Sequence, residues 1–184
     1  MMNKTDLSKY PVGEWAANVS VVKRTLWFFL NSMFLQSSFF PMMGFKKWLL
    51  RKFGAKIGKG VFIKPSVNIK YPWNLTIGDD TWIGEGVWID NLGKVSIGSN
   101  VCISQDSMLM CGNHNYKKST FNLMVGEITI EDGVWVGAKC LVCPGVTLHS
   151  HAVLTVGSVA STDLETYSIY RGNPAVKIKD RIIE

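Results

Sequence analysis

Aliphatic residues return at every sixth position along most of this chain. Small or β-branched residues commonly follow four positions later, as at Val61, Val67 and Thr81. Neither an α-helix nor an alternating strand has a six-residue period. A β-helix does, because each hexapeptide forms one flat side and three sides complete a coil. The repeating aliphatic positions are Ile57, Ile63, Ile69, Ile77, Ile83, Ile89, Ile97, Ile103, Leu109, Ile130, Val136, Val142, Leu148, Leu154 and Ala160.

Departures from the six-residue period indicate where the coils end. The first coils lengthen by two residues at one corner, since Ile69 and Ile77 are eight positions apart. A much longer interval separates Leu109 from Ile130. This interval predicts a loop, 110–129, that leaves the β-helix. We therefore expect one continuous column of inward aliphatic side chains, in which each coil covers the next.

The first fifty residues lack this period. An apolar run over 27–45 is interrupted by polar residues and by Pro41. Because proline and glycine break helices, this pattern predicts two helices, 20–37 and 44–53. The chain then divides into an N-terminal helical segment (1–56), a β-helix domain (57–165) and a short C-terminal segment (166–184).

Three placements of the two predicted helices remain open. They could pack on the side of the β-helix or on a neighbouring subunit, lie in the interface of a membrane, or span it. A spanning helix needs about 20 predominantly apolar residues, which this run reaches only if its polar cluster is included. Basic residues flank the run, and the net charge of +6 suits anionic lipid or an anionic cofactor. No nucleic-acid-binding motif is present, so no nucleic-acid partner is expected.

Cysteine usage and the first residues predict a cytoplasmic, reducing environment. Cys140 and Cys143 have the C-x-x-C spacing of some metal and redox sites. However, Cys140 occupies an inward position of the repeat whereas Cys143 follows the next aliphatic, so the two thiols point in different directions. Buried, unreactive thiols are the expectation. Residues 1–19 are polar and lack the apolar stretch of a secretory signal.

Only one of the three histidines lies where the repeat breaks. His149 and His151 fall inside a regular hexapeptide, where outward side chains are usually only solvated. His114 follows Gly112 and Asn113 at the point where the chain leaves the β-helix. A histidine at the mouth of a loop can act as a general base near neutral pH. A merely polar loop residue is the alternative interpretation.

A series of short motifs begins at His114. Gly-Asn-His is followed by a loop and then by the motifs Val-Trp-Val-Gly-Ala (134–138), Pro-Gly-Val-Thr (144–147) and Gly-Asn-Pro-Ala (172–175). This series resembles that of the hexapeptide-repeat acyltransferases, and in particular the maltose and galactoside O-acetyltransferases. Over 20–180 the chain is most similar to bacterial acetyltransferases of colanic acid biosynthesis. The resemblance implies an all-β core, a left-handed parallel β-helix, with N-terminal α-helices and a short C-terminal segment.

The resemblance also implies roles for individual residues. His114 corresponds to the catalytic base, and Trp135 to the aromatic residue beside the pantetheine arm of coenzyme A. Gly137 and Ala138 correspond to small residues that let this arm lie flat. The family's Val-Thr-Lys-Asp motif lacks its lysine at 159–163, so another cation must bind the phosphates. The remaining candidates on the coenzyme A side are Ser161, Arg171, Asn173, Pro174, Lys177 and Lys179.

Acceptor contacts are implied near the end of the second coil. Family members hold an asparagine there, and either Asp90 or Asn91 could correspond to it. Asn113, beside His114, is a further candidate. The resemblance implies transfer of an acetyl group from acetyl-coenzyme A to a saccharide hydroxyl in exopolysaccharide or capsule biosynthesis. It also implies a homotrimer with sites between subunits and no metal. A lipid-linked saccharide would give a reason for contact with the inner face of the membrane.

Two other functions fit parts of the pattern. A γ-class carbonic anhydrase is also a β-helix, but it needs three histidines that converge on zinc. The spacing of His149 and His151 does not place two outward ligands on one face. The other alternative is a catalytically inactive scaffold or membrane-associated partner in polysaccharide assembly, which a failure to bind acetyl-coenzyme A would favour.

Overall fold

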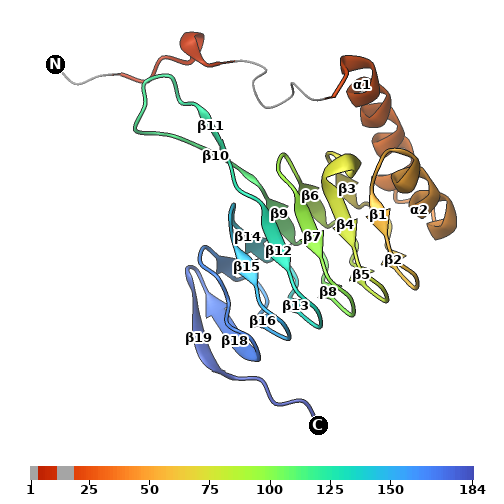
Figure 1. Ribbon diagram of the computed structural model, residues 1–184, viewed down its shortest axis with the longest axis vertical. Helices are drawn as coiled ribbons and strands as arrows, with labels where there is room; N and C mark the ends of the chain where they lie inside the picture. Colours follow the sequence, from red (N-terminus) through yellow and green to blue (C-terminus); the bar gives the residue numbers. More distant parts are fainter. Residues whose placement is uncertain (1–3, 12–18) are drawn as a thin grey trace.

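The chain is a three-sided parallel β-helix with two helices at its N-terminal end and a hairpin at its C-terminal end (Figure 1). The computed structural model describes residues 4–11 and 19–184. Most of the segment in which we expected no secretory signal, 1–19, lies outside the described residues. The predicted architecture of β-helix, N-terminal helices and short C-terminal segment is confirmed.

The coils of the β-helix form three sheets of parallel strands, one on each side, which we name sheets A, B and C; one antiparallel strand, β19, is added at the end of sheet B. Sheet A consists of β1 (Lys56–Ile57), β4 (Leu75–Ile77), β7 (Val95–Ile97), β12 (Ile128–Ile130) and β15 (Thr147–Leu148). Sheet B consists of β2 (Phe62–Ile63), β5 (Trp82–Ile83), β8 (Cys102–Ile103), β13 (Trp135–Val136), β16 (Val153–Leu154), β18 (Ser168–Gly172) and β19 (Ala175–Asp180). Sheet C consists of β3 (Asn68–Ile69), β6 (Trp88–Asp90), β9 (Met108–Met110), β14 (Leu141–Val142) and β17 (Val159–Ala160).

The predicted aliphatic residues stack in register through the core. Ile63 pairs with Ile83, and Ile83 pairs with Ile103. All of the repeating aliphatics except the half-buried Ile57 are buried. Truncating one of these side chains to alanine costs about 2–5 kcal/mol in a well-packed core. The coils also approach closely at their corners: a Cβ on Gly78 would lie 2.6 Å from the backbone of the next coil.

The two predicted helices are present within a few residues of their predicted ends. α1 spans Val21–Leu30 and continues as the π-helical turn η3 (Asn31–Leu35), and α2 spans Met43–Lys52. Ser20 caps α1, because its side chain accepts a hydrogen bond from the backbone N–H of Lys23. The described residues also contain two short 3-10 helices, η1 (Leu7–Lys9) and η4 (Pro72–Asn74). The latter occupies the two-residue insertion of the first coil.

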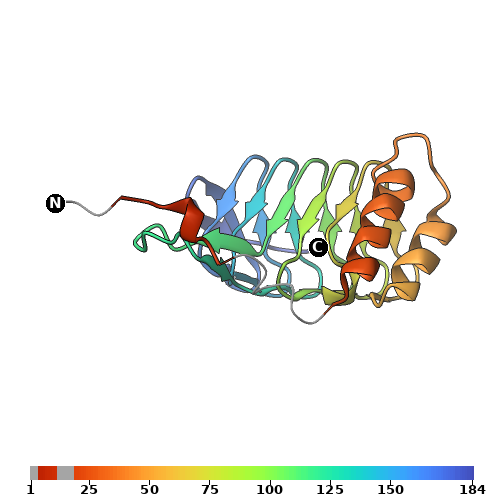
Figure 2. The ribbon, with the colours of Figure 1, turned by 90° about the horizontal axis from the view of Figure 1, so that it is seen from above.

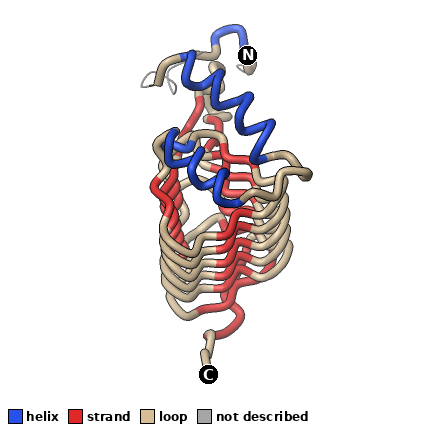
Figure 3. Tube along the Cα trace, turned by 90° about the vertical axis from the view of Figure 1, so that its right-hand side faces the viewer, coloured by secondary structure: helices blue, strands red, loops and turns tan. Residues whose placement is uncertain are grey.

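Side chains of the helices donate hydrogen bonds to the backbone carbonyl groups at the open edge of the first coil. Trp27 is buried, and its Nε1 donates to the carbonyl oxygen of Ile69 (2.8 Å). Lys46, Lys47 and Arg51 of α2 likewise donate to first-coil carbonyl oxygens. An unpaired sheet edge leaves exposed polar groups and invites association with other strands. The helices thus cap the end of the β-helix (Figure 2 and Figure 3). They pack against it, as one interpretation expected, but over its first coil and not on its side.

Large apolar side chains remain exposed on the helices and on the segment between them. They include Leu26, Phe28, Phe29, Met33, Phe39, Met42 and Trp48. Within the described residues, none of the helices combines the length and the hydropathy needed to cross a bilayer. The membrane interpretation expects the basic residues that flank the apolar run to contact lipid phosphates, and Lys46, Lys47 and Arg51 are among these residues. These side chains turn toward the β-helix instead, because the carbonyl groups of the first coil need donors.

Two antiparallel hairpins interrupt the parallel arrangement. β10 (Gly112–His114) pairs with β11 (Leu123–Val125) inside the predicted loop. β18 pairs with β19 and also extends sheet B beside β16. The first hairpin leaves the β-helix at the corner between sheets C and A, which we call the C–A corner.

Candidate active site

A cavity of about 430 Å³ lies at the C–A corner. This volume falls in the range of small-molecule sites, roughly 300–1,000 Å³. Residues from the N-terminal segment, the first three coils and the first hairpin line it: Tyr10, Lys70, Asp90, Leu92, Met110, Gly112, Asn113, His114 and Leu123. The fold therefore brings three of the predicted site residues, Asp90, Asn113 and His114, to one cavity.

His114 is held in a defined orientation. Its Nδ1 lies 3.0 Å from the carbonyl oxygen of Phe121. A carbonyl oxygen only accepts hydrogen bonds, so Nδ1 carries the proton and Nε2 of the neutral ring keeps its lone pair. The ring stacks on Phe121, with ring centroids 4.4 Å apart. The Tyr10 ring is tilted against the His114 ring, with centroids 5.8 Å apart. An imidazole with this tautomer can accept a proton through Nε2.

The backbone around His114 is also specialised. Asn113 Oδ1 accepts a hydrogen bond from the backbone N–H of His114 (2.8 Å), which fixes the start of the hairpin loop. Phe121 has a φ of 50°, a left-handed conformation that is uncommon for an aromatic residue. Strained conformations of this kind cluster at functional sites. Here the strained residue is the one whose carbonyl group orients the candidate base.

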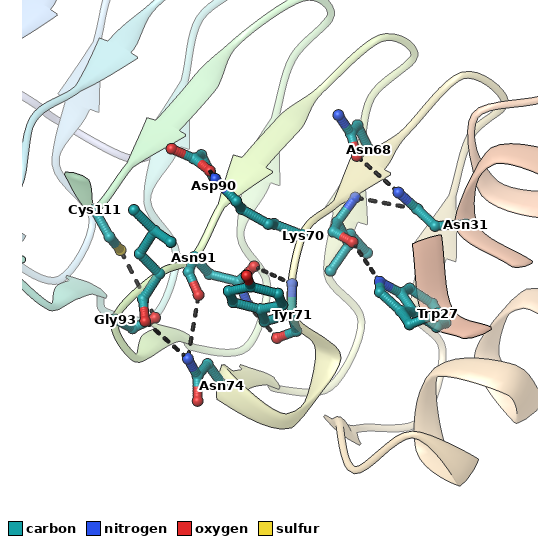
Figure 4. A network of polar contacts seen from close by, with 12 residues as sticks. Trp27, Asn31, Asn68, Lys70, Tyr71, Asn74, Asp90, Asn91, Gly93 and Cys111 are labelled. Carbon is teal, nitrogen blue, oxygen red and sulfur yellow. Dashed lines mark hydrogen bonds and ion pairs between the residues drawn. The ribbon is translucent and has the colours of Figure 1, made fainter. Parts of the chain in front are cut away.

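The structure separates the two alternatives at the end of the second coil (Figure 4). Asp90 lines the cavity, and its carboxylate lies 2.8 Å from Lys70 Nζ. Asn91 is fully buried, and its side chain exchanges two hydrogen bonds with the backbone of Tyr71. Asn91 therefore holds the corner of the coil, whereas Asp90 is the side chain that a bound acceptor could touch.

Sequence reasoning missed the other six lining residues of this cavity, among them the polar side chains of Lys70 and Tyr10. A register argument could have found Lys70, since it precedes Asp90 by twenty residues, the length of a coil in this region. Tyr10 carries no periodic signal. It reaches the cavity because the N-terminal segment crosses to the hairpin loop, where the backbone N–H of Asp6 donates to the Ser119 carbonyl oxygen (2.8 Å).

Trp135 lies on a different side of the molecule. It projects outward from β13, is 48% exposed, and donates from Nε1 to Ser104 Oγ (3.0 Å). Trp82 and Cys102 stand in the same column of sheet B. In a three-sided prism the C–A corner is opposite sheet B. None of the predicted coenzyme A residues lines the His114 cavity, so one chain does not bring the two halves of the predicted site together.

Gly137 has a structural reason for lacking a side chain. A Cβ there would lie 2.6 Å from the backbone nitrogen of Val156 in the next coil. The stacking of the coils thus requires glycine at this position, whether or not a pantetheine arm passes over it. Ala138 follows at the same corner and is half-buried. Beside it is Lys139, an exposed cation that sequence reasoning did not select.

The remaining coenzyme A candidates lie near the C-terminal hairpin. Lys177 Nζ contacts carboxylates of Glu165 (2.9 Å) and Asp180 (2.8 Å), which raise the pKa of the lysine. Because two carboxylates already balance its charge, Lys177 is the weaker candidate for a phosphate group. The other candidates are exposed: Ser161, Arg171, Asn173, Pro174 and Lys179.

The other histidines have partners and are not simply solvated, contrary to our expectation. His149 Nδ1 lies 3.0 Å from Glu131 Oε1, and the His151 ring stacks on Tyr167 with centroids 4.6 Å apart. Across residues 4–11 and 19–184, no group of three or more His, Cys, Asp or Glu side chains could hold a metal. Burial raises the pKa of Cys111 to about 11, which agrees with an unreactive thiol.

Comparison with known proteins identifies the family. No family model matches the chain. The Escherichia coli protein named "Putative colanic acid biosynthesis acetyltransferase WcaF" is 37% identical over 177 residues, which cover 96% of this chain and 97% of that protein. The chain belongs to the hexapeptide-repeat acetyltransferases. Among other members of this family, the Escherichia coli galactoside O-acetyltransferase is 26% identical over 72% of this chain and 66% of its own length.

Solved structures of hexapeptide-repeat acetyltransferases share the fold. An enzyme from Vibrio cholerae, VCA0836, was solved in complex with acetyl-coenzyme A. It has a TM-score of 0.82 and 22% identity, over 92% of this chain and 93% of that one. A galactoside acetyltransferase in complex with coenzyme A has a TM-score of 0.79 and 24% identity, over 92% and 84% of the two chains.

Proposed function

We propose that this acetyltransferase moves the acetyl group of acetyl-coenzyme A to a hydroxyl of a saccharide, in exopolysaccharide or capsule biosynthesis. The observation that carries the proposal is the setting of His114: Nδ1 is engaged by Phe121, and the ring lines a cavity with Asp90. The similarity to a protein named for colanic acid biosynthesis supports the acceptor class. Structural neighbours solved with acetyl-coenzyme A or coenzyme A support the donor.

The chemistry needs one base and a well-placed acceptor. An acceptor hydroxyl has a pKa far above 7, so it must lose its proton as it attacks the thioester carbonyl carbon. His114 Nε2 accepts that proton while the new C–O bond forms. The C–S bond then breaks, and protonated His114 returns the proton to the departing sulfur. Asp90 accepts hydrogen bonds from neighbouring acceptor hydroxyls and so orients the sugar, while Lys70 balances its charge.

Coenzyme A binds, in this proposal, along sheet B and the C-terminal hairpin. Trp135 and Ala138 lie along the pantetheine arm, and Ser161, Asn173 and Pro174 border the nucleotide end. Arg171, Lys179 and Lys139 are exposed cations suited to the phosphate groups. Acetyl-coenzyme A is a co-substrate that brings its own activated thioester, so the proposed chemistry assigns no step to a metal.

The active form is a homotrimer in this proposal. Each chain keeps His114 and Trp135 on opposite sides, so side-by-side packing is needed to bring the base of one subunit to the coenzyme A of the next. Proximity of the two reactants contributes much of the rate in such reactions. An incomplete site within one chain therefore favours a site shared between two.

The helical end of the protein contacts the inner face of a membrane in this proposal. The apolar residues exposed on α1, α2 and their connection suit the interface of a bilayer. Residues 15–78 contain ten Lys or Arg and no Asp or Glu. The bonds of Lys46, Lys47 and Arg51 to carbonyl groups leave their charges in place, so this end attracts anionic lipid.

A screen of acetyl-coenzyme A consumption tests the reaction. The purified protein is incubated with acetyl-coenzyme A and either nucleotide sugars or lipid-linked saccharides, and thiol release is followed. We expect release that depends on one saccharide class and on His114. No binding of acetyl-coenzyme A in calorimetry, together with no release, would instead identify the protein as an inactive scaffold.

A further inference from the structure

A second cavity, of about 570 Å³, lies between α1 and sheet C. Its wall includes Arg24, Phe28 and Phe29 from α1, together with Lys70, Tyr71 and Trp88 from the first two coils. Lys70 also lines the His114 cavity, whereas the other five residues lie outside the candidate active site. The proposed acetyl transfer makes no use of this second cavity.

One end of this cavity is polar and positively charged. Arg24 Nε is buried, and no described residue accepts a hydrogen bond from it. The Arg24 guanidinium lies beside the Tyr71 phenol, where its charge opposes the rise in the phenol pKa that burial causes. Arginine presents a planar set of donors that matches phosphate oxygens. The arginine end is therefore suited to a phosphate group.

The rest of the cavity is apolar and opens to solvent. Phe28 and Phe29 are 64% and 60% exposed, and Trp88 is 42% exposed. Exposed aromatic side chains around a hollow favour an apolar ligand, because burying their surface releases about 25 cal/mol for each Å². A free sugar or a nucleotide would leave this surface in water.

Lys70 connects the second cavity to the first. It lines both cavities, and its Nζ lies 2.8 Å from Asp90, which lines the His114 cavity. A ligand with its phosphate beside Arg24 and Lys70 could therefore extend in two directions. One direction follows the aromatic side chains, and the other leads past Asp90 to His114 (Figure 4 shows Lys70 and Asp90).

Charge across the molecule favours an anionic ligand at this end. Residues 15–78, which supply almost the entire wall, have a formal charge of +10, whereas the rest of the chain has a formal charge of −4. Such a separation concentrates anions at the helical end.

We propose that the second cavity binds the isoprenoid diphosphate of a lipid-linked saccharide. The diphosphate lies beside Arg24 and Lys70, and the first isoprene units lie against Phe28, Phe29 and Trp88. The attached sugar then enters the His114 cavity. This inference rests on the proposed function and specifies its acceptor: the sugar carries an isoprenoid diphosphate when it is acetylated.

Binding of farnesyl diphosphate to the full chain, measured by calorimetry, tests the cavity without acetyl transfer. We expect farnesyl diphosphate to bind more tightly than farnesol or inorganic pyrophosphate, because neither fragment uses both ends of the cavity. Arg24→Gln should weaken binding about tenfold or more, since it removes charged hydrogen bonds to the phosphate. Lys52→Gln, an exposed cation of the same helical end, should leave the affinity unchanged, and so should His114→Ala.

Three results would overturn the assignment. The first is no measurable binding of farnesyl diphosphate, and the second is equal binding by wild type and Arg24→Gln. The third is protection of 21–29 from hydrogen exchange that disappears when the oligomer dissociates, which would assign the cavity to a contact between two copies of the chain. If farnesyl diphosphate binds as expected but no acetyl group is transferred to any saccharide, the assignment of the cavity is supported and the proposed reaction is contradicted. Failure of the cavity assignment and failure of the proposed reaction therefore give different results.

Discussion

The Nδ1 atom of His114 lies 3.0 Å from the carbonyl oxygen of Phe121, and this contact decides which ring nitrogen can act as a base. If Nε2 accepts the acceptor's proton, His114→Ala should lower kcat by a factor of ~10²–10⁴ while the melting temperature stays near that of wild type. His149→Ala is the matched control, because His149 lies outside the cavity and should keep its turnover. Near-normal turnover in the His114 variant would exclude it as the base.

Trp135→Ala should weaken the binding of coenzyme A with a smaller effect on the acceptor KM, because the indole lies on the outward face of sheet B. Trp82→Ala provides a control from the same column, two coils earlier. Titration calorimetry with coenzyme A compares the two variants. Unchanged affinity in the Trp135 variant would show that the pantetheine arm lies elsewhere.

Subunit mixing tests whether the site is shared. Light scattering should give the mass of a trimer for the wild type, and a stable active monomer would contradict the proposal. His114→Ala and Trp135→Ala subunits are each impaired, but mixed trimers should recover part of the activity, because some of their sites contain both native residues. The double variant mixed with wild type serves as the reference. No recovery after verified mixing would place both residues in the same subunit's site.

Flotation on liposomes tests the membrane contact. The helices cap the first coil, so the test uses surface variants of the full chain and leaves the helices in place. The wild type should float with vesicles rich in anionic lipid and remain soluble with neutral ones. The combined variant Phe29→Ser, Met33→Ser and Phe39→Ser should float less, whereas Tyr116→Ser, an exposed aromatic on the hairpin loop, should behave like wild type. A wild type that stays soluble in both cases would leave the helices with a packing role alone.

Trp27→Phe should reduce the free energy of unfolding by about 1–3 kcal/mol, since it leaves the carbonyl oxygen of Ile69 buried without its donor. Trp48→Phe makes the same change at an exposed position of α2 and should stay within about 0.5 kcal/mol of wild type. Urea unfolding of both variants gives the comparison. Equal stabilities would mean that water replaces the indole N–H at the edge of the coil.

The six-residue period predicted the core because every sixth side chain points into the interior of the coil. Ile63 and Ile83 occupy the same inward position in adjacent coils and pair with each other, so their spacing in the sequence is enough to place them. The choice between Asp90 and Asn91 could not be made in this way, since both follow Ile89 and their directions depend on how the chain turns at the C–A corner. The place of Tyr10 in the cavity could not be predicted, because a long-range contact of a non-repetitive segment brings it there.

The two helices were predicted from the sequence, but the hydrogen bonds that their basic side chains donate to the first coil were not. Lys46, Lys47 and Arg51 follow an apolar run, a pattern that also occurs in segments that bind lipid. Only the three-dimensional structure shows that carbonyl groups at the edge of the first coil need donors and that these cations supply the hydrogen bonds.

The capped first coil also limits how copies of this protein can assemble. A β-helix with two open ends could add a second copy coil on coil, and repeated addition would propagate into a fibre. Here Trp27 and the basic residues of α2 occupy the hydrogen-bonding groups that such an addition would need. Growth along the axis is therefore blocked at this end, and self-association is directed to the flat sides, where rotation can close a ring of fixed size.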